Sequence, residues 1–201
     1  MKNKIKVIGI DNHNNYYSPK LKSNRLKLLK KLKNFKFYKT DIKNKNQLLS
    51  IFKKENPSYV IHLAAQAGVR YSFEKPQAYV SSNIEGTNNI LECMAKCKVS
   101  KIIFASSSSV YGNQKSLPIK ETNQTSPLNF YGLTKLMNEN QIKIFSKNYK
   151  IDYILLRFFT AYGEFGRPDM FIPKLKKNIL LGKPIDLFNK GKHKRDFTYV
   201  D

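Results

Sequence analysis

The chain has 201 residues, of which 41% are hydrophobic, and it carries a formal net charge of +23. This length allows one domain with a real core, and the apolar content excludes an intrinsically disordered chain. No apolar run approaches the length of a membrane span, and residues 7–10 are too short for the core of a signal peptide. We therefore expect a cytoplasmic protein without a membrane partner.

The basic charge would suit a nucleic-acid surface. However, the lysines are spread along most of the chain, and no recognised nucleic-acid-binding module accompanies them. We interpret them as solvated surface residues and expect no specific nucleic-acid partner. The two cysteines, Cys93 and Cys97, are one helical turn apart, and a metal site would need more ligands, so no metal is expected.

Segments of two kinds alternate along the chain. Short, mostly apolar runs predict strands at residues 4–10, 35–39, 59–63, 101–106 and 153–157. Segments with helical spacing predict helices at residues 18–32, 46–54, 76–98, about 127–145 and 170–181. The run at 59–63 is nearly all apolar, as a central parallel strand should be. We predict an α/β fold built on a doubly wound parallel sheet.

Two acids follow the first two predicted strands. Asp11 ends the first strand, and Asp41, which Ile42 follows, comes after the second. In a dinucleotide-binding fold, an acid at the end of the second strand accepts hydrogen bonds from the adenosine ribose, a role that Asp11 fits. An acid that opens a turn or a helix explains both positions about equally well, so the residues alone leave this choice open.

Tyr131 and Lys135 are the strongest candidates for chemistry. On a helix, residues four apart share a face, so the phenol and the ammonium would lie about one turn apart. A neighbouring positive charge lowers the pKa of a tyrosine and lets it accept a proton near neutral pH. In a chain so rich in lysine and tyrosine this spacing also arises by chance, and a solvated surface pair is the alternative.

A serine-rich stretch upstream supports a catalytic role for Tyr131 and Lys135. Residues 101–105 predict a buried strand, and a cluster of serine hydroxyls and a turn at Gly112 follow it. Ligands of open α/β sheets bind outside the carboxyl ends of the strands. The hydroxyl cluster would therefore lie where such a ligand binds.

These motifs together resemble the extended short-chain dehydrogenase/reductases of the NAD-dependent epimerase/dehydratase family that act on nucleotide sugars. Further motifs make the chain similar to the UDP-glucuronate 4-epimerases, and the resemblance runs from Ile5 to Asp201. The motifs that carry it are Val-Ile-Gly-Ile-Asp-Asn at 7–12, His-Leu-Ala-Ala-Gln-Ala-Gly-Val-Arg at 62–70, Ser-Ser-Ser-Ser-Val-Tyr-Gly at 106–112, Tyr-x-x-x-Lys at 131–135, Arg-Phe-Phe-Thr-Ala-Tyr-Gly at 157–163, Gly-Arg-Pro-Asp-Met at 166–170 and Arg-Asp-Phe-Thr-Tyr-Val-Asp at 195–201.

The resemblance implies a partial Rossmann-type NAD-binding domain over residues 1–201, with a substrate region that starts at about residue 165. It implies epimerisation at C4 of a UDP-sugar, from UDP-glucuronate to UDP-galacturonate. Ser107, with Ser108 as its competitor, and Tyr131 would bind the 4-hydroxyl, and Tyr131 would take its proton. Lys135 would keep the pKa of Tyr131 low and hold the nicotinamide ribose. The C4 hydride would pass to NAD and return to the other face of a 4-keto sugar.

The resemblance also implies two sets of binding residues. The cofactor would be bound by Asp11, Asp41, Ile42, Leu63, Ala64, Ala65, Tyr131, Lys135 and Phe158. The substrate would be bound by Arg70, Ser107, Ser108, Thr160, Arg167 and Arg195. A guanidinium such as that of Arg70 matches a sugar carboxylate in bidentate fashion, although a surface arginine is an equal alternative. A homodimer packed through the helices after Pro76 and Pro127 is also implied.

The chain departs from the family pattern near its start. The phosphate-binding glycine loop should lie roughly 20 residues before the ribose-binding acid. Here Gly9 is the only glycine before Gly68. We therefore expect a sheet that lacks its first βα unit and a chain that lacks most of the C-terminal substrate region. An inactive fragment or a degenerate paralogue without a cofactor site is the alternative from a different class.

The remaining alternatives concern the reaction. Related dehydratases carry an Asp-Glu pair where this chain has Ser108 and Ser109, which argues against dehydration. A 4-keto uronic acid is a β-keto acid that could lose CO2, so a UDP-glucuronate decarboxylase would share the first step. A UDP-glucose 4-epimerase is a further alternative. The set of motifs favours the UDP-glucuronate epimerase.

Overall fold

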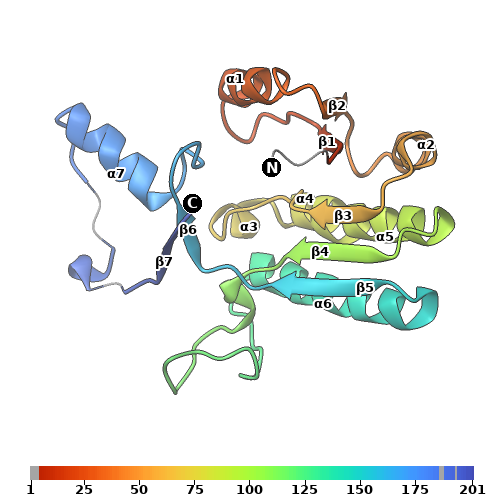
Figure 1. The fold of residues 1–201 in the computed structure, drawn as a ribbon. Helices are drawn as coiled ribbons and strands as arrows, with labels where there is room; N and C mark the ends of the chain where they lie inside the picture. The colour runs from red at the N-terminus through yellow and green to blue at the C-terminus, as the bar shows by residue number, and fades with distance from the viewer. Residues whose placement is uncertain (1–4, 186–187, 193) are drawn as a thin grey trace. The chain divides into compact units, whose positions relative to one another are not determined.

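Parallel strands and helices alternate through most of the chain (Figure 1). The computed structural model describes residues 5–185, 188–192 and 194–201. The chain divides into two units. One consists of Ile8–Asn12 and Phe37–Phe158, and the other contains His13–Lys36 and Phe159–Asp201. The α/β class and the parallel strand pairing that the sequence predicts are confirmed.

The first unit is built on three parallel strands in the order β3-β4-β5. Their bounds are Tyr59–His62 for β3, Lys101–Ala105 for β4 and Asp152–Leu156 for β5. The register aligns Ile61 with Ile103 and Ile103 with Ile154. Because the strands are parallel, their carboxyl ends meet at one edge of the sheet, where ligands of such sheets bind.

Helices α2 (Lys45–Glu55), α5 (Gly86–Lys96) and α6 (Phe130–Tyr149) enclose the core of this unit. Figure 1 shows α5 and α6 running beside β4 and β5. Asn44 caps α2 and Asn129 caps α6, each through its side-chain oxygen, which satisfies a backbone N–H of the first turn. The most buried apolar residues of the core are Leu48, Phe52, Ile90, Leu91, Met94, Val99, Ile102, Phe104, Ile142 and Ile151.

The helical segment predicted at 76–98 is interrupted. It consists of α4 (Pro76–Tyr79), a π-helical turn (Val80–Glu85) and α5. A short helix, α3 (Tyr71–Glu74), precedes it. A π-turn inserts one residue into the helix and often marks a functional position. This turn brings the side chain of Asn83 into the interior, where it is 1% exposed.

The other elements are shorter. Strands β1 (Val7–Asp11) and β2 (Phe35–Lys39) form a two-stranded sheet, and the Thr40 amide donates to the Asp11 carbonyl over 3.2 Å. The second unit contains α1 (Pro19–Leu29), the parallel strands β6 (Thr160–Tyr162) and β7 (Phe197–Tyr199), and α7 (Phe171–Leu180). Single 3₁₀ turns span Ser108–Val110 and Phe188–Gly191.

One expectation about burial is wrong. Strand β3 is not buried on both faces, because Tyr59 and Ile61 are 65% and 64% exposed while His62 faces the core. Side chains alternate across a strand, and an apolar run does not reveal which face another element covers. Helix α1 begins after Ser18 as predicted, but it ends at Leu29, before the predicted end at residue 32.

Among the described helices, none is both long enough and apolar enough to cross a membrane.

Candidate active site

The serine-rich segment leaves β4 at the carboxyl edge of the sheet. Ser106 and Ser107 are both buried. The Ser107 hydroxyl accepts a hydrogen bond from the Ser109 amide over 3.1 Å and so caps the 3₁₀ turn that follows. The Ser108 amide donates to the Phe158 carbonyl over 2.8 Å, which ties this turn to the residue after β5. The structure thus holds Ser107 and Ser108 between the ends of two strands.

The first turn of α6 packs closely against this serine segment. Asn129 accepts a hydrogen bond from the Gly132 amide over 2.8 Å and fixes the start of the helix. A methyl group added at Gly132 would lie only 2.6 Å from the Ser109 carbonyl oxygen, so only glycine allows this approach. Tyr131 is the neighbour of Gly132 and is half-buried. The sequence-predicted hydroxyl cluster and the start of the Tyr131 helix are therefore in direct contact.

Lys135 lies one turn further along α6 and is 3% exposed. Its ammonium donates a 2.7 Å hydrogen bond to the Ala105 carbonyl, the last residue of β4, and lies 4.6 Å from the centre of the Phe104 ring. Burial lowers the pKa of Lys135 to about 8. The alternative of a solvated surface pair is therefore wrong for Lys135, which is an interior cation at the carboxyl end of β4.

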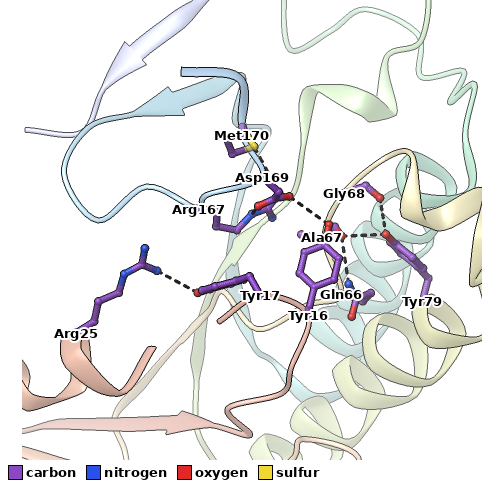
Figure 2. A network of polar contacts seen from close by, with 10 residues as sticks. All are labelled: Tyr16, Tyr17, Arg25, Gln66, Ala67, Gly68, Tyr79, Arg167, Asp169 and Met170. Atoms are coloured by element: carbon purple, nitrogen blue, oxygen red, sulfur yellow. Dashed lines mark hydrogen bonds and ion pairs between the residues drawn. The ribbon is translucent and has the colours of Figure 1, made fainter. Parts of the chain in front are cut away.

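Tyr79 connects Tyr131 to the loop that follows β3. It is 0% exposed, and its ring meets the Tyr131 ring edge-on with 6.2 Å between centroids. Its hydroxyl donates to the Ala67 carbonyl over 2.9 Å and also to the Gly68 carbonyl, as Figure 2 shows. The sequence analysis missed Tyr79, because nothing in its spacing reveals a partner at Tyr131, 52 positions away.

A second set of contacts joins the same loop to α6. The Asn83 side-chain oxygen accepts a hydrogen bond from the Gln66 amide over 2.7 Å. Its side-chain nitrogen donates to the Gln66 carbonyl over 3.1 Å and to the Thr134 hydroxyl over 3.0 Å. Buried polar groups that are fully paired in this way hold their elements in one arrangement. The π-turn that carries Asn83 therefore fixes the loop after β3 relative to the helix of Tyr131 and Lys135.

His62 is a structural residue at this edge of the sheet. It is 2% exposed, and its Nε2 lies 3.0 Å from the Thr87 hydroxyl. Burial, with a smaller effect of the Lys135 charge, lowers the pKa of His62 to about 3. A histidine with so low a pKa binds a proton too weakly to act as a general base near neutral pH.

Six of the predicted cofactor-binding residues lie at or just after the ends of β1, β2 and β3. Asp11 ends β1, and Asp41 accepts hydrogen bonds from the Asn12 side chain and the Lys43 amide, each over 2.9 Å. Asp41 thus opens a turn, as one of its two interpretations required. Ile42 packs against the core and fills the space beside Gly86. Beyond β3, Leu63 is 66% exposed and is followed by the small residues Ala64 and Ala65.

Two further predicted residues lie at exposed positions of this unit. Arg70 immediately precedes α3, and its carbonyl accepts a hydrogen bond from the Phe73 amide over 3.0 Å. Phe158 follows β5 by two residues, and its side chain is 49% exposed. Both stand at the ends of strands or loops on the carboxyl side of the sheet.

Three predicted substrate-binding residues belong to the second unit. The Thr160 amide donates to the Asp196 carbonyl over 3.2 Å, and the exposed Arg195 donates to the Lys194 carbonyl over 3.1 Å. Arg167 makes a bidentate ion pair with Asp169, with distances of 3.1 Å and 3.0 Å. Figure 2 shows this pair together with the Tyr16 hydroxyl, which lies 3.2 Å from the Asp169 carboxylate.

The donor groups of the first unit fit a nicotinamide dinucleotide. Asp11 ends β1, where a ribose would be hydrogen-bonded. Small side chains follow β3, and a flat ring can approach the backbone there. An ammonium has three donors, so Lys135 can hold ribose hydroxyls in addition to the Ala105 carbonyl.

Comparisons with known proteins identify relatives of this chain. The chain is 46% identical over 195 residues to a UDP-glucuronate 4-epimerase of Thermodesulfobacterium geofontis, a match that covers 97% of this chain and 60% of the relative. It is 44% identical to UDP-glucuronate 4-epimerase 1 of Arabidopsis thaliana, over 97% of this chain and 46% of the relative. The chain thus spans about half to three fifths of the length of these curated relatives.

A solved structure is also similar to this one. The UDP-glucuronic acid 4-epimerase of Bacillus cereus, solved in complex with UDP-glucuronic acid and NAD, superposes with a TM-score of 0.89 at 38% sequence identity. The match covers 96% of this chain and 60% of that chain. The model of the family described as "NAD dependent epimerase/dehydratase family" matches residues 1–201. The chain belongs to the NAD-dependent epimerase/dehydratase family.

Proposed function

We propose that the protein is an NAD-dependent 4-epimerase that interconverts UDP-glucuronate and UDP-galacturonate. The observation that carries this proposal is the contact between the first turns of α6, with Tyr131 and the buried Lys135, and the serine-rich end of β4. The identity of 44–46% to named UDP-glucuronate 4-epimerases supports the choice of substrate.

In this proposal Tyr131 is the general base. Its phenolate oxygen takes the proton of the sugar 4-hydroxyl, while the Ser107 hydroxyl, or that of Ser108, holds the same oxygen in place. NAD, when bound, supplies reversible acceptance of a hydride. Tyr131 returns the proton to the 4-oxygen when the 4-keto sugar has presented its other face, so one side chain serves both directions.

The positive charge of Lys135 stabilises the Tyr131 phenolate that this role needs. With a pKa of about 8, most of its amine is protonated at neutral pH. A positive charge one helical turn from a phenol, in an interior of low dielectric, favours the phenolate. The hydrogen bond to Ala105 keeps this charge on the β4 side of the helix, beside the serine segment.

The carboxylate of the sugar acid needs an arginine. Arg70 and Arg167 are the candidates, since a guanidinium binds a carboxylate with two parallel hydrogen bonds. Arg167 is held in one orientation by Asp169 through a bidentate pair. Thr160 and Arg195 complete the proposed substrate set, and Asp11, Asp41, Ile42, Leu63, Ala64, Ala65 and Phe158 complete the proposed cofactor set.

Incubation with defined sugar nucleotides tests the proposal. The protein purified from its own cells and saturated with NAD would be given UDP-glucuronate, UDP-glucose or UDP-galacturonate, and the products would be identified by NMR. We expect the two uronic acids to interconvert, and Tyr131→Phe to abolish the conversion. Turnover of UDP-glucose alone would show that the substrate is wrong, and release of CO2 with a pentose product would favour the decarboxylase.

A further inference from the structure

A buried carboxylate lies on the same face of α6 as Tyr131 and Lys135. Glu139 follows Lys135 by four residues, so the three side chains are spaced one turn apart along the helix. The Glu139 side chain is 0% exposed. Acidic side chains are almost never fully buried unless they are paired, so the partners of Glu139 indicate what it does.

Glu139 has one partner just after β4 and another just after β5. Its Oε1 accepts hydrogen bonds from the Ser106 hydroxyl over 2.5 Å and from Arg157 Nε over 3.0 Å. Its Oε2 accepts from Arg157 Nη2 over 2.8 Å. Burial would raise the pKa of Glu139, but the hydrogen bonds from Arg157 and Ser106 outweigh it and lower the pKa. Glu139 is therefore ionised at neutral pH and accepts three hydrogen bonds.

These partners bracket the serine segment. Ser106 stands between Ala105, whose carbonyl accepts from Lys135, and Ser107. Arg157 precedes Phe158, whose carbonyl accepts from the Ser108 amide. The Glu139 carboxylate thus joins Ser106, which precedes Ser107, to Arg157, which precedes the hydrogen-bond partner of Ser108.

Arg157 extends the same attachment. Its guanidinium lies 4.9 Å from the centre of the Tyr111 ring, at the end of the serine segment. Its Nη1 donates to the Glu121 carbonyl over 3.2 Å. The ion pair therefore reaches both ends of the segment from Ser106 to Tyr111, and a bidentate pair of this kind fixes orientation as well as distance.

We propose that Glu139 is a positioning residue for the epimerase reaction, a proposal that rests on the function proposed above. Its carboxylate joins Ser106 and Arg157 and so fixes the Ser107–Ser108 segment against the helix that carries Tyr131 and Lys135. Glu139 touches neither sugar nor cofactor in this role. It acts on the separation between the serine hydroxyl and the Tyr131 oxygen, to which the rate of proton transfer is sensitive.

Three variants and two measurements test this role. Glu139→Gln keeps the shape but removes the charge, and Ser106→Ala removes one of the three donors. Ile142→Ala is the matched control, because Ile142 is a buried core residue of the same helix and contacts neither Ser106 nor Arg157 through a polar group. The measurements are steady-state kinetics and the hydrogen exchange of the Ser108 amide. The exchange of the Phe104 amide, in the core strand β4, serves as the reference for global opening of the protein.

For Glu139→Gln we expect kcat to fall roughly 10- to 100-fold, as misplacement of reacting groups by about 1 Å can do, with the KM for the UDP-sugar changed by less than about threefold. Exchange at Ser108 should rise about tenfold relative to Phe104. Ser106→Ala should act in the same direction, and the double variant should be no worse than Glu139→Gln alone, because both act through one contact. Ile142→Ala should lower stability and leave kcat and the exchange ratio as in the wild type.

A Glu139→Gln variant with unchanged kcat and exchange ratio would overturn the proposal, as would an Ile142→Ala variant that shows the same changes. If Glu139→Gln does not fold, Ser106→Ala decides the question. A wild-type protein that does not epimerise UDP-glucuronate would overturn the proposed function, whereas the exchange ratio would still test whether Glu139 fixes the serine segment.

Discussion

Replacing Lys135 by methionine should change how stability depends on pH. In the native protein the pKa of Lys135 is about 8, against an ordinary value of 10.5, because the amine is buried. Below pH 8 both native and unfolded chains carry the charge, and the native state bears the full cost of burying it. Between pH 8 and 10.5 the unfolded chain binds more protons, so the stability of the wild type rises with pH.

The magnitude follows from the shift. One pKa unit corresponds to about 1.4 kcal/mol, so a shift of about 2.5 units corresponds to about 3 kcal/mol. Lys135→Met has no such group, and Met fills a similar volume. The free energy of unfolding of the wild type, relative to that of Lys135→Met, should therefore rise by about 3 kcal/mol between pH 7 and pH 10.5.

Urea unfolding followed by circular dichroism at several pH values measures this difference. Lys147→Met, at an exposed position near the end of the same helix, controls for the loss of one positive charge. Lys135→Met should also abolish epimerisation while remaining folded. A difference between the wild type and Lys135→Met that does not vary from pH 7 to 10.5 would refute the conclusion that the Lys135 charge is held in the interior against a desolvation cost.

Three further changes have defined outcomes. As pH falls from 6.5 toward 3, only the unfolded chain protonates His62, so the free energy of unfolding of the wild type should fall by up to about 5 kcal/mol. His62→Gln should lose this pH dependence in acid unfolding, and a variant that unfolds in acid as the wild type does would contradict it. Gly132→Ala would place a methyl group 2.6 Å from the Ser109 carbonyl, so kcat should fall by about 100-fold, whereas Asn140→Ala on the exposed face of α6 should leave kcat unchanged. Tyr79→Phe removes the hydroxyl that donates to the Ala67 and Gly68 carbonyls, and the free energy of unfolding, measured with heat or urea, should fall by about 1–3 kcal/mol. The affinity for NAD, measured by calorimetry, should also weaken, and an unchanged affinity would show that the loop after β3 does not depend on Tyr79.

Local features of the sequence predicted much of the fold. The predicted strand at 35–39 coincides with β2, and β4 ends within one residue of its prediction, since short apolar runs between helical segments have few other interpretations. The start of α1 was also predictable, because Ser18 and Pro19 form a good helix start. These signals act between residues close in sequence.

Contacts between distant residues were not predictable in the same way. Helical spacing placed Tyr131 and Lys135 on one face, but it did not reveal that Lys135 meets Ala105 or that Glu139 meets Arg157. An acid spaced four residues after Lys135 was the signal that could have drawn attention to Glu139. The π-turn around Asn83 and the exposed face of β3 likewise depend on packing that no single segment encodes.

The most direct test of the proposed function follows a label at C4 of the sugar. UDP-glucuronate carrying deuterium at C4 would be incubated with the protein and NAD in ordinary water, and the product would be examined by NMR and mass spectrometry. If Tyr131 removes the hydroxyl proton and the hydride leaves and returns within one closed site, UDP-galacturonate should form with the deuterium retained at C4. Loss of the deuterium to solvent, or a product without its carboxylate, would contradict the proposed epimerisation.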